Sequence, residues 1–375
     1  MKKQQMHKPL KIIISGGGTG GHVFPAISIA NAIKEKNPDA DILFVGASGK
    51  IEMDKVPKAG YKIEGLPVKG FNRKNIFKNI SVLMNLLKSI IKANRIIKQF
   101  KPDVVVGVGG YASGPVLFRA NREGIPTLLQ EQNSYAGVTN RLLSKKAKKV
   151  CVAYDGMEKY FPGEKIVLAG NPVRKDIKSN LLKQGQFLNF YGFDKNVKTI
   201  LILGGSLGAR TINNSILRSI NVLLEYGYQV IWQTGKYYYK KIIELTGHLK
   251  TSRLKIADFI AEMDMAYAVA DIIVSRAGAG TISELCIIGK PVILVPSPNV
   301  AEDHQTKNAM ALVGKNAALM VKDSEAGEKL VNQIVELLSD EDLQEKLAGN
   351  IKKLAMPNSA GIIADEIIKL SKVCQ

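Results

Sequence analysis

Residues 10–22, LKIIISGGGTGGH, place an apolar run directly before a glycine-rich turn. A short β-branched run without polar alternation is typical of a strand that is buried on both faces of a parallel sheet. Glycines permit positive φ and a close approach of a ligand to the backbone. An amphipathic helical pattern follows from about Pro25, and the N–H groups at the start of a helix favour an anion. The stretch predicts a strand, an anion-binding turn and a helix, which is how a doubly wound α/β domain begins.

The same order of strand, turn and helix recurs along the chain. Further strands are predicted at 41–46, 104–106, 127–129 and 149–152 and, after about residue 170, at 199–203, 229–232, 271–275 and 291–295. Glycine turns follow at 107–114 (GVGGYASG), 204–210 (GGSLGAR) and 276–284 (RAGAGTISE). Ligands of open parallel sheets bind beyond the carboxyl ends of the strands. We therefore expect an α/β protein of two Rossmann-like doubly wound domains that face each other across a cleft lined by these turns.

The length of 375 residues agrees with two domains. Glycine and an Asn-Pro pair interrupt the pattern at 169–172, AGNP, which indicates a boundary. We expect an N-terminal domain over residues 1–168 and a C-terminal domain over residues 169–356. The tail 357–375 has helical spacing, is too short to be a domain, and is expected to pack on one of the two.

Charge and cysteine content narrow the function classes. The chain has 53 Lys and Arg against 33 Asp and Glu, a formal net charge of +20, which predicts an anionic partner: nucleic acid, a phosphate-bearing substrate or an acidic lipid surface. Three distant cysteines without a Cys-x-x-Cys pair argue against a disulfide framework or a zinc cluster. No apolar run approaches the ~20 residues needed to span a bilayer. We expect a protein that is soluble or lies on a membrane surface.

Two features leave alternatives open. The first turn also matches the dinucleotide pattern G-x-G-x-x-G, but a nicotinamide enzyme needs an acidic residue at the end of the second strand, and residues 46–49 (GASG) contain none. Glu284 lies one turn into the helix that the glycine turn at 276–284 opens. Its carboxylate could accept hydrogen bonds from two ribose hydroxyls, or it could simply stabilise the start of the helix.

Taken together, these segments resemble the MurG family, the UDP-N-acetylglucosamine:undecaprenyl-pyrophosphoryl-muramoyl-pentapeptide N-acetylglucosaminyltransferases of peptidoglycan synthesis. The resemblance covers most of the chain in the family's order. It rests on GGGTGGHVFP at 16–25, GVGGYASGP at 107–115, EQN at 131–133, GNPVR at 170–174, GGSLGAR at 204–210 and the segment 278–284. It implies a GT-B fold whose C-terminal helix crosses back to the first domain.

The resemblance also implies the reaction and its location. The enzyme would move GlcNAc from UDP-GlcNAc, with inversion, to the C4 hydroxyl of MurNAc in undecaprenyl-pyrophosphoryl-MurNAc-pentapeptide (lipid I), forming lipid II at the cytoplasmic face of the bacterial plasma membrane. No cofactor is implied. A UDP-sugar epimerase on the same two-domain scaffold is the alternative.

The residues that the resemblance assigns to UDP-GlcNAc come from both halves of the chain. They are Thr19, Gly20, Gly21, Asn133, Arg174, Ser206, Ile260, Ala279, Gly280, Thr281, Ile282, Ser283, Glu284 and Gln305. Among them, Ile260 would contact uracil through its backbone, Glu284 would bind the ribose, and Gln305 would reach the GlcNAc hydroxyls. Gln130 and His304 depart from the family's pattern, so neither is given a role.

The reaction needs a base for the acceptor hydroxyl and stabilisation of the charge on the leaving diphosphate. Of the four histidines, His22 lies on the first phosphate loop, and we expect it to be the base, with a structural or capping role as the alternative. A metal looks unnecessary, because helix dipoles and Arg174 can replace a divalent cation. The Asp-x-Asp at 39–41 precedes a strand and indicates a solvated turn.

Residues 65–102 contain no Asp or Glu but nine Lys and Arg, beside apolar residues at helical spacing. An apolar helix face flanked by lysines suits an anionic membrane surface, where each basic residue contributes ~1 kcal/mol. The alternative is a helix that buries its apolar side against the sheet. The residues predicted to dock are Ile76, Phe77, Ile80, Met84, Leu87, Lys88 and Lys92. Nucleic acid is not expected as a partner, since no helix-turn-helix, zinc-finger or RNA-stacking pattern occurs.

Overall fold

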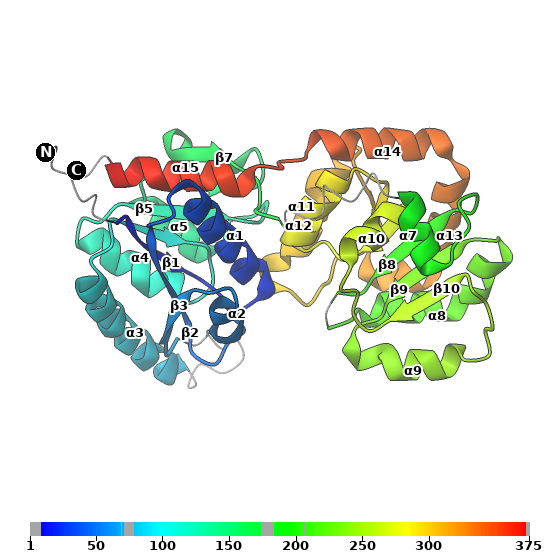
Figure 1. Ribbon diagram of the computed structural model, residues 1–375, viewed down its shortest axis with the longest axis horizontal. Helices are drawn as coiled ribbons and strands as arrows, with labels where there is room; N and C mark the ends of the chain where they lie inside the picture. Colours follow the sequence, from blue (N-terminus) through cyan, green and yellow to red (C-terminus); the bar gives the residue numbers. More distant parts are fainter. Residues whose placement is uncertain (1–8, 69, 71–78, 174–183, 206, 373–375) are drawn as a thin grey trace, which may run out of the picture. The chain divides into compact units, whose positions relative to one another are not determined.

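The computed structural model describes residues 9–68, 70, 79–173, 184–205 and 207–372. The chain divides into two compact units (Figure 1). Unit 1 comprises Met1–Val173 and Pro357–Gln375, and unit 2 comprises Arg174–Met356. Each unit is an α/β domain built on its own sheet.

Unit 1 is built on a seven-stranded sheet in the order β3-β2-β1-β4-β5-β6-β7. Its elements are β1 (Lys11–Ser15), α1 (Gly20–Lys36), β2 (Asp41–Ala47), α2 (Glu52–Lys58), β3 (Lys62–Leu66), α3 (Asn79–Phe100), β4 (Val104–Gly107), α4 (Ser113–Arg122), β5 (Thr127–Glu131), α5 (Val138–Ser144), β6 (Lys149–Val152), β7 (Ile166–Leu168) and α15 (Ser359–Lys372). Every neighbouring pair of strands is parallel. Ile12 and Ile14 enter one core and Ile13 the core on the opposite face, so the sheet is buried on both sides as its apolar runs predicted.

Unit 2 repeats this plan with a six-stranded parallel sheet in the order β10-β9-β8-β11-β12-β13. Its elements are α7 (Gln184–Tyr191), β8 (Thr199–Leu203), α8 (Arg210–Glu225), β9 (Gln229–Gln233), α9 (Lys236–Thr246), β10 (Leu254–Ala257), α10 (Met263–Val269), β11 (Ile272–Ser275), α11 (Ala279–Ile288), β12 (Val292–Leu294), α12 (His304–Val313), β13 (Leu319–Met320), α13 (Ala326–Ser339) and α14 (Glu341–Lys353). The prediction of two Rossmann-like doubly wound domains is confirmed.

The strand order places all four glycine turns at equivalent points. In each sheet the chain reverses its direction of winding between two central strands, β1 and β4 in unit 1 and β8 and β11 in unit 2. Each of these four strands ends at a glycine turn, and the paired positions Ser15 with Gly107 and Leu203 with Ser275 put both turns of a unit at one edge. This topological switch point is where doubly wound sheets bind ligands.

Helix α15 at the end of the chain lies beside α1 in unit 1 (Figure 1). Ile363, Ala364 and Ile367 are fully buried in the same core as Ile29 of α1. Lys36 forms an ion pair with Asp365 at 2.7 Å at the exposed rim of this contact. The last helix thus completes a core that the first helix begins.

One expected element boundary is wrong. Helix α1 begins at Gly20 with Thr19 as its N-cap, five residues before the expected start near Pro25, which lies inside the helix. Gly20 and Gly21 therefore belong to the first helical turn and not to the preceding loop. The sequence pattern misplaced the start because glycine is disfavoured inside helices and proline is common at their first position.

No helix within the described residues is both long and apolar enough to cross a membrane.

Candidate active site

The two glycine turns of unit 1 are packed against each other. The Gly17 N–H donates to the Gly109 carbonyl at 3.3 Å, and the Ser113 hydroxyl lies 2.8 Å from the Ser15 carbonyl and 2.9 Å from that of Gly109. A Cβ at Gly110, which has φ +83°, would overlap the Gly17 carbonyl oxygen. Several of these glycines are therefore required by contacts between the turns and not by a ligand.

The outer side of the first turn is open. A Cβ at Gly18 would meet no atom within 4 Å, and Gly18, Thr19 and Gly21 are exposed. The first N–H groups of a helix have no partner within it. The first turn of α1, with Gly20 and Gly21, therefore presents backbone donors on the side where an anionic ligand can approach.

His22 stands on this first helical turn and is half-buried. Its Nδ1 lies 3.1 Å from the Thr19 hydroxyl oxygen. Its Nε2 lies over Gly109, where an added Cβ would be 2.8 Å from that nitrogen. If Nδ1–H donates to Thr19, Nε2 carries the lone pair and is the nitrogen that can accept a proton.

Asn133 follows β5 and is held by a carboxylate that the sequence analysis did not single out. Glu131 is 3% exposed and accepts hydrogen bonds from the backbone and side-chain nitrogens of Asn133 at 3.1 and 3.3 Å. It also accepts from Gly137 N at 3.1 Å and Asn140 Nδ2 at 2.9 Å. The available signal was an acidic residue at the end of a fully buried strand, where an unpaired charge would be costly.

Gln130, whose role was left open, is part of a buried amide network. Its side-chain nitrogen donates to Asn171 Oδ1 at 2.9 Å, and Asn171 Nδ2 donates to the Gln132 carbonyl at 2.9 Å. Gln132 Nε2 donates to the Val108 carbonyl at 2.6 Å and contacts Gln130 Oε1. The network joins the turn after β4, the EQN segment and the GNP segment.

In unit 2, the turn after β11 leads into α11, whose N-cap is Gly278. Ala279, Gly280 and Thr281 form the first turn, so their N–H groups point out of the helix start. Ile282 is 2% exposed, its side chain belongs to the protein interior, and its N–H donates to the Gly278 carbonyl at 2.9 Å. The Ser283 hydroxyl donates to the Ala279 carbonyl at 3.1 Å. Backbone donors at 279–281 are therefore the groups of this turn that suit an anion.

Glu284 lies on α11 one turn further in and is half-buried. The hydroxyl of Tyr267, a residue of α10 that is 1% exposed, donates to Glu284 Oε2 at 3.1 Å. This bond fixes the carboxylate from a neighbouring helix, which a role limited to the helix start does not require. Tyr267 could not be identified from the sequence, because its contact with Glu284 joins two different helices.

Gln305 on α12 joins two turns through its carbonyl oxygen. Oε1 accepts hydrogen bonds from Ser297 N at 2.8 Å and Ala277 N at 3.3 Å. The side-chain nitrogen is then the group available for a sugar hydroxyl. Ile260, after β10, is 7% exposed, so a ligand would meet its backbone and not its side chain.

An ion pair between Arg276 and Asp323 was also not predicted from the sequence. Arg276 Nη1 lies 2.5 Å from Asp323 Oδ1 and 2.9 Å from the Val295 carbonyl. The Thr211 hydroxyl of α8 donates to Asp323 Oδ2 at 2.9 Å. Asp323 therefore connects the turn after β11 with the first turn of α8, which follows the turn after β8.

Burial shifts the pKa values of two side chains in unit 2. Desolvation lowers the pKa of Lys290 to about 8, and nearby Asp271 opposes the shift. The Lys290 ammonium donates to the carbonyls of Ala268, at 2.6 Å, and Ala270, at the end of the helix that carries Tyr267. Burial also raises the pKa of the Cys286 thiol on α11 to about 12, so this cysteine is a poor nucleophile.

Helix α3 separates two apolar faces. Ala93, Ile96 and Ile97 are buried in the core of unit 1, and Val82 is also buried. The opposite face exposes Leu83, Met84, Leu87 and Ile91, each by 55–64%. The exposed Lys88 lies beside them. Lys92, by contrast, donates to the Gly65 carbonyl at 2.8 Å and lies 3.3 Å from Glu64, so it is partly engaged with β3.

Some of the predicted site residues cannot be placed. Arg174, Ser206, Ile76 and Phe77, and the side chain of Ile80, lie outside the part of the chain that the structure describes.

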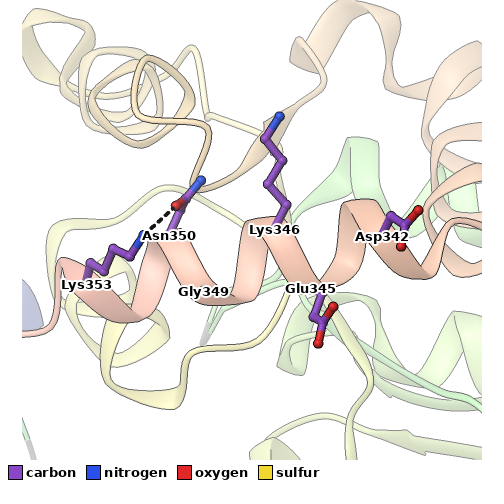
Figure 2. Close-up of a pocket in the computed structure, with 6 residues that line it drawn as sticks. All are labelled: Asp342, Glu345, Lys346, Gly349, Asn350 and Lys353. Carbon is purple, nitrogen blue, oxygen red and sulfur yellow. Dashed lines mark hydrogen bonds between the residues drawn. The ribbon is translucent and has the colours of Figure 1, made fainter.

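A shallow hollow on the surface of α14 contains none of the predicted residues (Figure 2). It is lined by Asp342, Glu345, Lys346, Gly349, Asn350 and Lys353, and Lys353 donates to Asn350 at 3.3 Å. Its mixed charges and open shape indicate ordinary solvated helix surface.

Comparison with known proteins gives the same family over both units. The glycosyltransferase family 28 N-terminal domain matches residues 12–152, and the glycosyltransferase family 28 C-terminal domain matches residues 199–360. A relative from Bacteroides thetaiotaomicron is 58% identical over 98% of this chain and 99% of its own length, and one from Porphyromonas gingivalis is 50% identical over 99% and 98%. Both are named UDP-N-acetylglucosamine--N-acetylmuramyl-(pentapeptide) pyrophosphoryl-undecaprenol N-acetylglucosamine transferase.

Solved structures agree with this result. The crystal structure of Acinetobacter baumannii MurG is 29% identical, with a TM-score of 0.79, over 96% of this chain and 100% of that one. A UDP-GlcNAc 2-epimerase from Neisseria meningitidis, 16% identical with a TM-score of 0.66 over 96% and 100% of the two chains, shares the fold alone. The two parallel sheets with their switch-point turns are those of the GT-B fold. The matched domains and the near-complete relatives show that this chain belongs to glycosyltransferase family 28 and, within it, to the MurG family.

Proposed function

We propose that this chain transfers GlcNAc from UDP-GlcNAc to the C4 hydroxyl of MurNAc in lipid I, with inversion, to form lipid II. The observation that carries the proposal is the match along almost the whole chain to transferases named for this reaction. The UDP-GlcNAc 2-epimerase, in contrast, shares only the fold at 16% identity.

Unit 2 supplies the groups that the donor needs. The N–H groups of 279–281 at the start of α11 suit the diphosphate, since a helix N-terminus carries about half a positive charge. Glu284, oriented by Tyr267, accepts hydrogen bonds from two ribose hydroxyls. The Gln305 side-chain nitrogen donates to a GlcNAc hydroxyl, because its oxygen is already used by Ser297 and Ala277.

Unit 1 supplies the acceptor side and the base. His22 Nε2 takes the proton from the C4 hydroxyl as that oxygen attacks C1 of GlcNAc, and the bond from C1 to the diphosphate breaks. UDP leaves with the electron pair, and backbone N–H donors and the helix dipole of α11 stabilise the charge that develops on it. The Thr19 hydroxyl contacts the other ring nitrogen, Nδ1, and helps to orient the imidazole.

The exposed face of α3 is proposed to rest on an anionic membrane surface, where a lipid-linked acceptor is found. Four neighbouring large apolar side chains of this helix are more than half exposed, a pattern that often marks an interaction site. The basic residues beside them add electrostatic attraction of ~1 kcal/mol each to anionic lipids.

Product analysis tests the proposed reaction directly. The protein is incubated with UDP-GlcNAc labelled in the sugar and a soluble lipid I analogue, and products are separated with and without the acceptor. We expect labelled GlcNAc to move to the acceptor with release of UDP, and no conversion of the donor alone. Formation of an epimeric UDP-sugar without acceptor would instead support the epimerase.

A further inference from the structure

A buried carboxylate lies beneath the first glycine turn. Glu52, in the first turn of α2, is 1% exposed. Its Oε2 accepts a hydrogen bond from the Gly18 N–H at 2.8 Å, and its Oε1 accepts one from the Ala47 N–H, also at 2.8 Å. Hydrogen bonds to an ionised acceptor are about twice as strong as neutral ones. The carboxylate thus ties the turn after β1 to the end of β2.

Two glycines make room for this carboxylate. A Cβ at Gly17, which has φ +144°, would overlap the Glu52 carboxylate, and a Cβ at Gly46 would lie 2.5 Å from Glu52 Cγ. Gly18 differs, since its outer side is open. Gly17 and Gly46 are therefore explained by Glu52, and Gly18 is left to adopt a φ of +87° with its N–H directed at the carboxylate.

The next residue after Gly18 links this contact to the reaction. Thr19 is the N-cap of α1, and its hydroxyl oxygen lies 3.1 Å from His22 Nδ1. A rotation of the Gly18–Thr19 backbone would move the N-cap and with it the hydroxyl that contacts His22 Nδ1. The bond from Glu52 to the Gly18 N–H holds the peptide immediately before Thr19 and so restrains this movement.

We propose that Glu52 is a positioning residue for the transfer reaction, acting through Gly18 and Thr19 on His22. This inference rests on the proposed function, in which His22 is the base. Since the Gly18 N–H is occupied by Glu52, the donors of this turn that remain for an anionic ligand are those of the first turn of α1.

The test replaces the carboxylate by an amide of the same size. In Glu52→Gln, one oxygen becomes an NH₂ group, so one of the two backbone N–H groups faces a donor and loses its acceptor. We expect kcat to fall about 10- to 100-fold, the range for a catalytic group displaced by a fraction of an ångström to an ångström. The KM for UDP-GlcNAc should change less than kcat, because the donor ligands proposed on α11 and α12 do not contact Glu52, and only Thr19, Gly20 and Gly21 follow the turn that it holds.

Matched variants separate positioning from general stability. Asp54→Asn removes a carboxylate from the same helix, but Asp54 is exposed and pairs with Lys58, so kcat should not change. Glu52→Asp keeps the charge on a shorter side chain and should give an intermediate kcat. It also serves as the test if Glu52→Gln does not fold. A kcat near that of the unaltered protein for folded Glu52→Gln, or for Glu52→Asp in its place, would overturn the proposal even if the melting temperature falls.

Hydrogen exchange distinguishes failure of this inference from failure of the proposed function. Amides of residues 16–22 should exchange faster in Glu52→Gln than in Asp54→Asn, whatever reaction the protein catalyses. Unchanged exchange there would overturn the role of Glu52 in holding the turn. Faster exchange in a protein whose unaltered form transfers no GlcNAc would overturn the catalytic assignment and leave the structural contact standing.

Discussion

At the scale of single residues, the proposed base depends on which ring nitrogen of His22 carries the proton. The Thr19 hydroxyl contacts Nδ1, and Nε2 is the nitrogen proposed to take the proton of the acceptor hydroxyl. His22→Ala removes this acceptor for the proton, and we expect kcat to fall about 10²- to 10⁴-fold with UDP binding retained. Steady-state kinetics with the lipid I analogue measures the change.

His248→Ala is the matched control for His22, because His248 is exposed beyond α9 in unit 2 and should leave kcat unchanged. Near-normal turnover in His22→Ala would assign this histidine to the capping role instead.

Glu284 is expected to contribute to donor binding rather than to the chemical step. A hydrogen bond to a charged group contributes about 1.5–3 kcal/mol, so Glu284→Ala should raise the KM for UDP-GlcNAc at least tenfold. Tyr267→Phe keeps the carboxylate but removes the hydroxyl that orients it at 3.1 Å, and should give a smaller increase. Exposed Glu244 on α9 is the control, as Glu244→Ala removes the same charge away from the site. An unchanged KM in Glu284→Ala would exclude the ribose role.

At the scale of secondary-structure elements, α3 combines a buried and an exposed apolar face. Packing against the sheet requires the first face, and docking on a membrane surface requires the second. Reversing Lys88 and Arg95, both exposed on this helix, should weaken binding to anionic vesicles by at least ~2 kcal/mol, about 30-fold, because each basic residue contributes ~1 kcal/mol. Vesicle co-sedimentation measures the loss, and added salt should reduce binding of the unaltered protein.

Lys346→Glu on α14 is the control for the charge reversal on α3, since it also reverses a surface charge but lies in unit 2 (Figure 2). Equal vesicle binding by the α3 variant and the unaltered protein would place the docking surface elsewhere.

The sequence predicted central strands well and edge strands not at all. Each of the nine predicted strands overlaps an observed one, whereas β3, β7, β10 and β13, the edges of the two sheets, were missed. A central parallel strand is buried on both faces and shows as a continuous apolar run. In β3 (KIEGL) polar residues interrupt the apolar ones, and β7 (IVL) is an apolar run of only three residues; both strands are partly exposed.

The candidate site also contains groups that could be predicted from the sequence and groups that could not. The turns could be located because glycines directly follow apolar runs. The position of Glu284 one turn into a helix made it a candidate ribose ligand, and the family resemblance supplied Gln305. The groups that hold those turns could not be found, since Glu52 is 34 positions from Gly18 and Asp323 is 47 from Arg276. Contacts between such distant positions can be identified only once the order of the strands in the sheet is known.

At the scale of the whole molecule, the chain leaves unit 1, forms unit 2 and returns to unit 1 with its last helix. The first and last helices therefore belong to one cooperative core, although more than 300 residues separate them. Each unit has its own buried apolar cluster, so damage to one core should not directly weaken the other.

Ile367→Ala tests this division. Ile367 is fully buried in the core of unit 1, and truncation of a buried isoleucine to alanine costs about 2–5 kcal/mol. Hydrogen exchange should accelerate at β1 and β4 and stay unchanged at β8 and β11. Ile334→Ala on α13, equally buried in unit 2, should give the opposite pattern. Because the proposed donor ligands on α11 and α12 are in unit 2, UDP binding should survive Ile367→Ala at temperatures where β1 exchanges freely. Equal acceleration of both sheets in either variant would mean that the two units unfold together.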